Sequence, residues 1–140
     1  DLTGINLRGA NLAATSFDNS TLDDAQMRGV SISYQTTFQQ ASLRHSDLRN
    51  VYFNHADLPG ADLSFADLTD AYLRYSDLSN ATLNYVMAQN ADFYWANFEN
   101  INLNKINYNL LLSKIARSTC DFRVQYLFHI APIFIFPIFF

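Results

Sequence analysis

The chain has 140 residues, of which 49% are hydrophobic, and a formal net charge of −4. This length predicts one domain that can bury a core, and only 4 Gly and 3 Pro argue against a disordered linker. The acidic balance argues against direct nucleic-acid binding, which needs a basic surface, and the single cysteine, Cys120, excludes an internal disulfide.

A five-residue period begins at the first residues and continues to about residue 110. Between Ala56 and Ala81 every fifth residue is leucine, from Leu58 to Leu78, and the residue two places before each leucine is Ala or Ser. A period of five fits neither an α-helix, at 3.6 residues, nor a β-strand, at 2. It therefore indicates a structural repeat, and we call the large residue of each repeat its centre.

The repeats read ADLPG, ADLSF, ADLTD, AYLRY and SDLSN. This pattern closely resembles the pentapeptide-repeat family, written A(D/N)LXX, and the match covers roughly residues 1–110. The resemblance implies an all-β fold, a right-handed quadrilateral β-helix in which four repeats make one coil. The centre and the small residue two before it then point inward. We expect this β-helix over residues 1–109, with about five and a half coils stacked at the β-spacing of about 4.8 Å.

Successive repeats can be assigned to the four sides of a square coil, which groups the centres into stacks. The stacks are Phe17, Phe38, Leu58, Leu78 and Phe98 on side one; Leu2, Leu22, Leu43, Leu63, Leu83 and Leu103 on side two; Leu7, Met27, Leu48, Leu68, Ala88 and Tyr108 on side three; and Leu12, Ile32, Phe53, Leu73 and Phe93 on side four. The Asp or Asn before many centres is expected to bond nearby backbone groups in turns. One extra residue among Ser33, Tyr34 and Gln35 predicts a bulge at a corner.

The repeat ends after Tyr108. Residues 110–119 predict a short capping helix over the last coil, with Lys114 and Arg117 near its C-terminal end, where cations are favoured. Residues 120–140 form an apolar tail that is short for a membrane-spanning helix and contains Pro132 and Pro137. We interpret the tail as a packed cap or a self-association strand that would make a homodimer. Membrane contact, and a foreign or disordered end, are the alternatives.

No residue pattern predicts catalysis, a cofactor or a metal site. Asp57, Asp62 and Asp67 lie on successive sides of the coil and do not face one another as an acid–base pair. His45 and His55 are two repeats apart and point to opposite sides, so they cannot share a metal ion. The chain is therefore predicted to be non-enzymatic.

Two outward ladders are the candidates for binding a protein partner. The residues after the centres of side three include Arg8, Arg28 and Arg49, and side four carries Tyr52, His55, Tyr72, Tyr75, Tyr94 and Trp95. The arginines are interpreted mainly as a solvated stripe interleaved with Asp47 and Asp67, with an anion or acidic partner as the alternative. Stacked aromatics stabilise β-ladders by themselves, but exposed Tyr and Trp are also typical of interface anchors.

The expected function is a rigid scaffold that presents these ladders to a protein partner of unknown identity. Two alternatives come from the resemblance: a nucleic-acid mimic that interacts with DNA gyrase, which the arginine stripe weakens, and the repeat domain of a larger secreted bacterial effector. The chain opens at Asp1 without Met or a leader, so we expect a fragment or a processed chain. A cytoplasmic location is favoured, with a secreted or lumenal one as the alternative.

Overall fold

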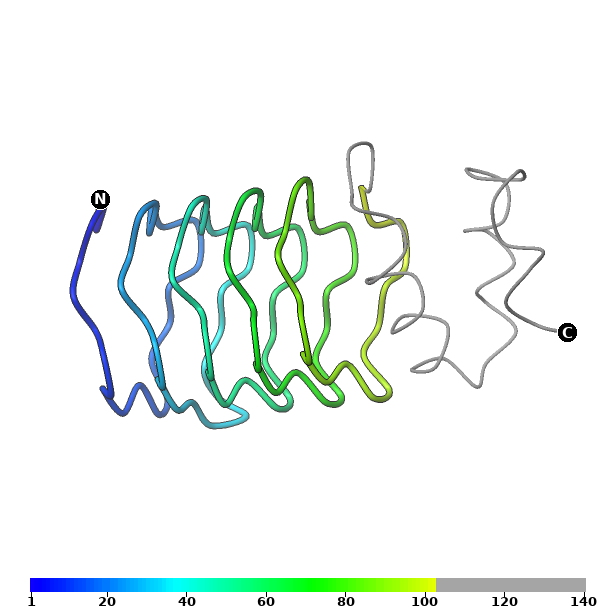
Figure 1. Cartoon of the computed structure of the whole chain (residues 1–140), viewed down its shortest axis with the longest axis horizontal. Coiled ribbons are helices and arrows are strands. Elements are labelled where there is room, and N and C mark those ends of the chain that lie inside the picture. Colours follow the sequence, from blue (N-terminus) through cyan, green and yellow to red (C-terminus); the bar gives the residue numbers. More distant parts are fainter. Residues whose placement is uncertain (103–140) are drawn as a thin grey trace, which may run out of the picture.

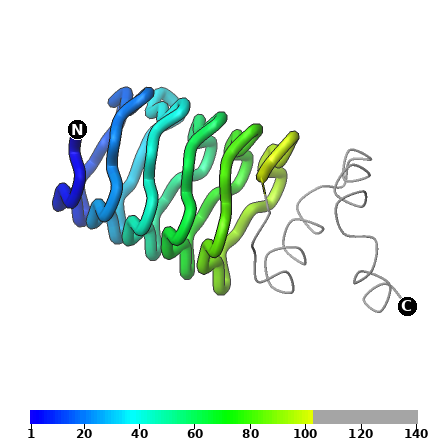
Figure 2. Tube along the Cα trace, turned by 90° about the horizontal axis from the view of Figure 1, so that it is seen from above, coloured from blue at the N-terminus to red at the C-terminus, as the bar shows by residue number. Residues whose placement is uncertain are grey.

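The computed structural model describes residues 1–102, which form a rod of about five stacked coils (Figure 1). Parallel bridges join residues 20 apart in successive coils, as in Asp57↔Asp77 and Asp62↔Thr82. Seen from above, the coils follow one another along the rod from the N-terminus (Figure 2). The predictions for the capping helix at 110–119 and the apolar tail at 120–140, and the centres Leu103 and Tyr108, lie outside the described residues.

The described residues contain no helix and no continuous strand, because a turn follows every bridge. Each side contributes one isolated bridging residue to a parallel ladder that runs along the rod. The backbone N–H of a centre donates to the residue before the next centre in the stack: Leu63 donates to the carbonyl of Thr82 at 2.8 Å, and Leu68 to that of Met87 at 2.7 Å. The predicted stacks of centres are thus confirmed wherever the structure describes them.

The core is built from the centres and the small residues two places before them. Leu58, Leu63 and Leu68 are at most 1% exposed, and so are Ala61 and Ala66. The inward direction of both positions is therefore as predicted. Because coils are closely spaced and joined by backbone hydrogen bonds, the interior has room for one large and one small side chain on each side.

A β-turn closes each corner of the coil. The N–H three residues after a centre donates back to the carbonyl of that centre, as Ala66 does to Leu63 at 3.0 Å. The residue two after the centre has a positive φ, between 54° and 70°, at every described corner but one. This is the pattern of a type II turn, which favours Gly or Asn at that position. Gly60, with a φ of 70°, is one such residue.

The exceptional corner is the predicted bulge. Bridges across it join residues 21 apart, beginning with Ser16↔Thr37, and the turn is closed by the Thr36 N–H and the Ser33 carbonyl at 3.0 Å. Thr36 is fully buried, and its hydroxyl donates to the Leu12 carbonyl at 2.8 Å. The extra residue is absorbed at this corner without disturbing the stacks on either side, and Tyr34 is left 77% exposed.

Candidate partner-binding surface

Side four carries a group of exposed rings that we call the aromatic face. Its members are Tyr52, His55, Tyr72, Tyr75, Tyr94 and Trp95, which come from three consecutive coils. The five tyrosine and tryptophan side chains are 42–52% exposed. The repeat phase predicts this outward direction, and the exposure of the rings confirms it.

The rings of the aromatic face contact one another in two ways. Tyr52 and Tyr72 stack with centroids 5.1 Å apart, and His55 and Tyr75 stack at 5.0 Å. Tyr94 makes T-shaped contacts at 6.0 Å with Tyr75 and with Trp95. The rings of the first two of these coils therefore stack face to face. Within the described residues, the only ring contact of Trp95 is its T-shaped contact with Tyr94.

Three members of the aromatic face occupy left-handed corner positions. The φ values of His55, Tyr75 and Trp95 are 60°, 58° and 58°. A left-handed backbone costs on the order of 1 kcal/mol for a residue with a Cβ, and bulky residues are seldom found there. Folding alone would favour the Gly, Asn or Asp that stand at most other corners. At these three corners, therefore, the residue type is unfavourable for the backbone conformation that it adopts.

A second aromatic ladder lies at the corner after side two. It consists of His45, Phe65 and Tyr85, whose rings stack face to face at 4.7 Å and 4.9 Å. These residues also have positive φ values. Their continuous stacking offsets the backbone strain, since an aromatic pair contributes about 0.5–1.5 kcal/mol beyond its buried area. This second ladder therefore has a structural explanation that does not extend to Trp95.

Arg74 shows how the aromatic face holds a cation. Its Nε lies 2.6 Å from Oδ2 of Asp92, and its Cζ lies 5.9 Å from the centroid of the Tyr94 ring. Oδ1 of Asp92 also accepts the Tyr94 N–H at 3.0 Å. The hydrogen bond to Asp92, together with the charge of that carboxylate, raises the pKa of Arg74. A ring and a carboxylate two residues apart on one coil thus hold a guanidinium between them.

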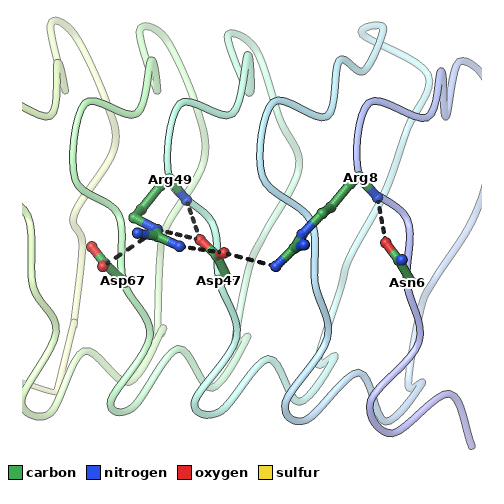
Figure 3. A network of polar contacts seen from close by, with 5 residues as sticks. All are labelled: Asn6, Arg8, Asp47, Arg49 and Asp67. Carbon is green, nitrogen blue, oxygen red and sulfur yellow. Dashed lines mark hydrogen bonds and ion pairs between the residues drawn. The ribbon is translucent and has the colours of Figure 1, made fainter.

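The arginines of side three are largely engaged with carboxylates of the same side (Figure 3). Nε and Nη2 of Arg49 each lie 2.7 Å from an oxygen of Asp47, and its Nε lies 3.8 Å from Asp67. Arg8 reaches the same Asp47 at 3.9 Å. Arg28 is exposed and has no ion pair within the described residues. For Arg8 and Arg49 these contacts favour a stripe in which arginines alternate with carboxylates. They argue against a site for an external anion.

Side one is acidic and contains no arginine in the described coils. Its carboxylates, Asp18, Asp57, Asp77 and Glu99, make no ion pair in this part of the chain. Asp77 supports its turn as predicted, because Oδ1 accepts the Ser79 N–H at 2.9 Å. Asp57 cannot do so, since the residue two places on is Pro59, which has no N–H. Burial raises the pKa of Asp57, and the charges of Asp77 and Asp18 raise it further.

Sequence reasoning missed two features of this region. Tyr34 stands exposed at the bulged corner between sides four and one, in the coil before His55. The one-residue shift of the repeat at this point is the sequence signal that places Tyr34 at this corner. The second feature is Asp57: its place in the repeat predicts a turn hydrogen bond, although Pro59 lacks the N–H that such a bond needs.

We expect Asp47→Asn and Asp57→Asn to change the free energy of unfolding in opposite directions at pH 7. The hydrogen bond from Arg49 lowers the pKa of Asp47, so its ionised form stabilises the fold and this contribution is lost as the pH falls through the folded-state pKa. The pKa of Asp57 is raised, so its ionisation weakens the fold as the pH rises through the folded-state value. Asp47→Asn should therefore destabilise and Asp57→Asn stabilise, each by about 1 kcal/mol or less, because both carboxylates are partly exposed and solvent screens their charges.

Urea unfolding of both variants at pH 7 and pH 3 measures this difference. Both effects should shrink at the lower pH, as the carboxylates become protonated. Changes of the same sign at pH 7 would contradict the assignment of the two environments.

Residues 1–102 show neither a metal site nor a membrane-spanning helix. No group of three His, Cys, Asp or Glu residues in this range lies close enough together to hold a metal ion. No helix in the same range is long and apolar enough to cross a membrane.

Comparison with solved structures finds several similar proteins. A pentapeptide repeat protein from the Arabidopsis thaliana thylakoid lumen is 27% identical over 74% of this chain and 68% of its own, with a TM-score of 0.38. The pentapeptide repeat protein Rfr23 from the cyanobacterium Cyanothece 51142 is 21% identical over 73% of this chain and 86% of its own, with a TM-score of 0.30. A trypsin-treated form of QnrB1, a plasmid-mediated fluoroquinolone resistance protein, is 13% identical over 78% of this chain and 72% of its own, with a TM-score of 0.49.

A search of curated proteins finds no match. The family model for pentapeptide repeats matches residues 1–33, 34–64 and 61–104, in 8 copies. These ranges cover most of the chain and coincide with the coils described above. The chain therefore belongs to the pentapeptide repeat family.

Proposed function

We propose that this chain is a non-enzymatic interaction module, a rod that presents its aromatic face to a protein partner. One observation carries the proposal: Trp95 is about half exposed and occupies a left-handed corner where folding favours Gly or Asn, and no ring among the described residues stacks on it face to face. Bulky residues held in an unfavourable left-handed backbone conformation often mark functional sites. We also propose that the coils of the rod are right-handed and that residues 110–119 form a helix that caps it.

The rod supplies rigidity that makes such a surface effective. Hydrogen bonds between coils, such as that from the Tyr75 N–H to the Tyr94 carbonyl at 2.8 Å, fix the positions of the rings before any partner arrives. Tyrosine and tryptophan bring large contact areas with few rotatable bonds. Little freedom is lost on binding, and this favours affinity.

A nucleic-acid mimic is the second candidate. The acidic residues of side one favour it, because they form an unpaired row in the described part of the rod. The row is interrupted in the second coil, where Thr37 and Gln39 stand at the outward positions. If the full chain inhibits DNA gyrase, and Asp57→Asn with Asp77→Asn abolishes that inhibition, this candidate replaces the first.

The first candidate is tested by partner capture with the full chain. We expect Tyr75→Asn with Trp95→Asn to lower the amount of captured protein at least tenfold. Asparagine accepts the left-handed corner, so this variant should remain folded, with an unfolding free energy within about 1 kcal/mol of the wild type. Quantitative mass spectrometry measures the amount of captured protein, and urea unfolding measures the unfolding free energy.

A matched control variant makes the same change at the second ladder, with Phe65→Asn and Tyr85→Asn. It removes two rings from left-handed corners at the other aromatic corner of the coil, and it should capture partners as well as the wild type does. Its stability should fall more than that of the first variant, because two face-to-face stacks are lost. Undiminished capture by the Tyr75 and Trp95 variant would show that the aromatic face is structural.

A further inference from the structure

We infer that the aromatic face takes an arginine-rich, extended segment of a partner protein, whose guanidinium groups lie between its rings and the carboxylates that border it. This inference rests on the proposed function and adds the chemistry of the partner. It is carried by one filled arrangement within the chain, around Arg74, and by two carboxylates at the border of the aromatic face that hold no cation.

The filled arrangement is the one around Arg74. Its guanidinium meets the carboxylate of Asp92 at 2.6 Å and lies over the ring of Tyr94 at 5.9 Å. The ring and the carboxylate belong to residues two apart on the same coil. The chain thus supplies its own example of the ligand that this surface accepts.

The two carboxylates without a cation, Asp57 and Asp77, lie just after the corner between sides four and one. Asp57 follows His55 by two residues, and Asp77 follows Tyr75 by two residues, in consecutive coils. The carboxylate of Asp57 has no hydrogen bond or ion pair to the described residues, and that of Asp77 uses only Oδ1, for Ser79 and Asn97. Both residues are part-exposed, so a guanidinium from outside can reach them. Each pair is a ring and a carboxylate two residues apart, as Tyr94 and Asp92 are, but here the ring comes first in the chain and the pair spans a corner. No arginine of the described residues pairs with either carboxylate.

The charges of the rod select a cationic partner. Residues 1–102 contain twelve acidic side chains and five arginines, and four of these arginines are paired: Arg8, Arg44, Arg49 and Arg74. Burial is the main cause of the raised pKa of Asp57, and the charges of Asp77 and Asp18, which raise it further, are not compensated by a cation beside the aromatic face. Nucleic acids and anionic lipid surfaces would be repelled, whereas a cationic chain is attracted to the carboxylates of Asp57 and Asp77 on side one.

The spacing of the rod suits an extended chain. Consecutive coils repeat at about 4.8 Å, and residues i and i+2 of an extended chain are about 6–7 Å apart, a difference that long arginine side chains can take up. Arginine is preferred to lysine because its planar group both stacks on rings and binds a carboxylate through two donors.

The test uses the full chain and a fluorescently labelled hexa-arginine peptide, with hexa-glutamate as the control peptide. Anisotropy measures affinity, and the emission of Trp95, the single tryptophan, reports whether the peptide sits at the aromatic face. We expect the wild type to bind hexa-arginine with a change in Trp95 emission, and hexa-glutamate not to bind. Asp57→Asn with Asp77→Asn should weaken binding at least tenfold; Asn97, the next residue along this stack, shows that asparagine fits there.

A charge-matched control carries Asp24→Asn and Asp70→Asn, which remove the same charge from corners away from side one. It should weaken binding less than twofold. Equal loss in the two double variants would mean diffuse attraction and would overturn the inference, as would an absence of binding or binding without a change at Trp95. If hexa-arginine fails while partner capture still depends on Tyr75 and Trp95, the proposed function stands and only the arginine-rich occupant is refuted.

Discussion

Replacing Phe38 with alanine is expected to lower the free energy of unfolding by about 3–5 kcal/mol, the range for removing a buried phenylalanine. Phe38 is completely buried, and its ring stacks on Phe17 at 5.1 Å and on Phe53 at 5.3 Å. It therefore joins two coils and two sides of the core. The coil backbones are held together by hydrogen bonds, so the cavity cannot collapse fully and the loss should reach the upper part of this range.

Phe38→Leu is the matched control, because Leu58 and Leu78 occupy the same stack in the next coils. It should cost about 1 kcal/mol, since a large apolar side chain is kept. Urea unfolding followed by circular dichroism measures both variants. A loss below about 1 kcal/mol for the alanine variant would mean that the three rings do not act as a core element.

Replacing Ala66 with leucine is expected to destabilise the rod by about 1–3 kcal/mol through overpacking. Ala66 is completely buried two residues before Leu68, and its own carbonyl accepts the Met87 N–H at 3.1 Å. The Asp67 N–H donates to the preceding coil, to the carbonyl of Ser46, at 3.0 Å. Hydrogen bonds on both sides hold the coil spacing, so the added volume must distort the core.

Ala66→Ser separates the need for a small residue from the need for an apolar one. Serine stands at the equivalent inward position at Ser46 and Ser76, where the hydroxyl donates to the carbonyl three residues earlier at 2.6 Å and 2.8 Å. The introduced hydroxyl would donate to the Leu63 carbonyl in the same way, and the change should be within about 0.5 kcal/mol of neutral. Urea unfolding compares the two variants, and a serine variant less stable than the leucine variant would refute the size argument.

The aromatic residues illustrate how far the repeat phase predicts a surface. Counting from the centres correctly placed Tyr52, Tyr75 and Trp95 outside, because inward and outward positions follow directly from the five-residue period. The phase could not tell that Tyr75 stacks on His55 while Trp95 meets its neighbour edge to face. These contacts depend on side-chain rotamers and on the residues of adjacent coils, which are 20 positions away in the sequence.

The five-residue period determined which positions repeat, and with the resemblance to the pentapeptide-repeat family it determined the fold, the stacks of centres and the buried positions, because a repeat of this kind buries a core only when its coils stack. The corner bulge also followed from it, since one extra residue cannot be absorbed inside a paired side. Only the tertiary structure decided which charges are partnered. Arg8 and Asp47 meet across two coils, whereas Asp57 remains unpaired beside Pro59. Pairing depends on distances between coils and on backbone donors, and a pattern of residue types contains neither.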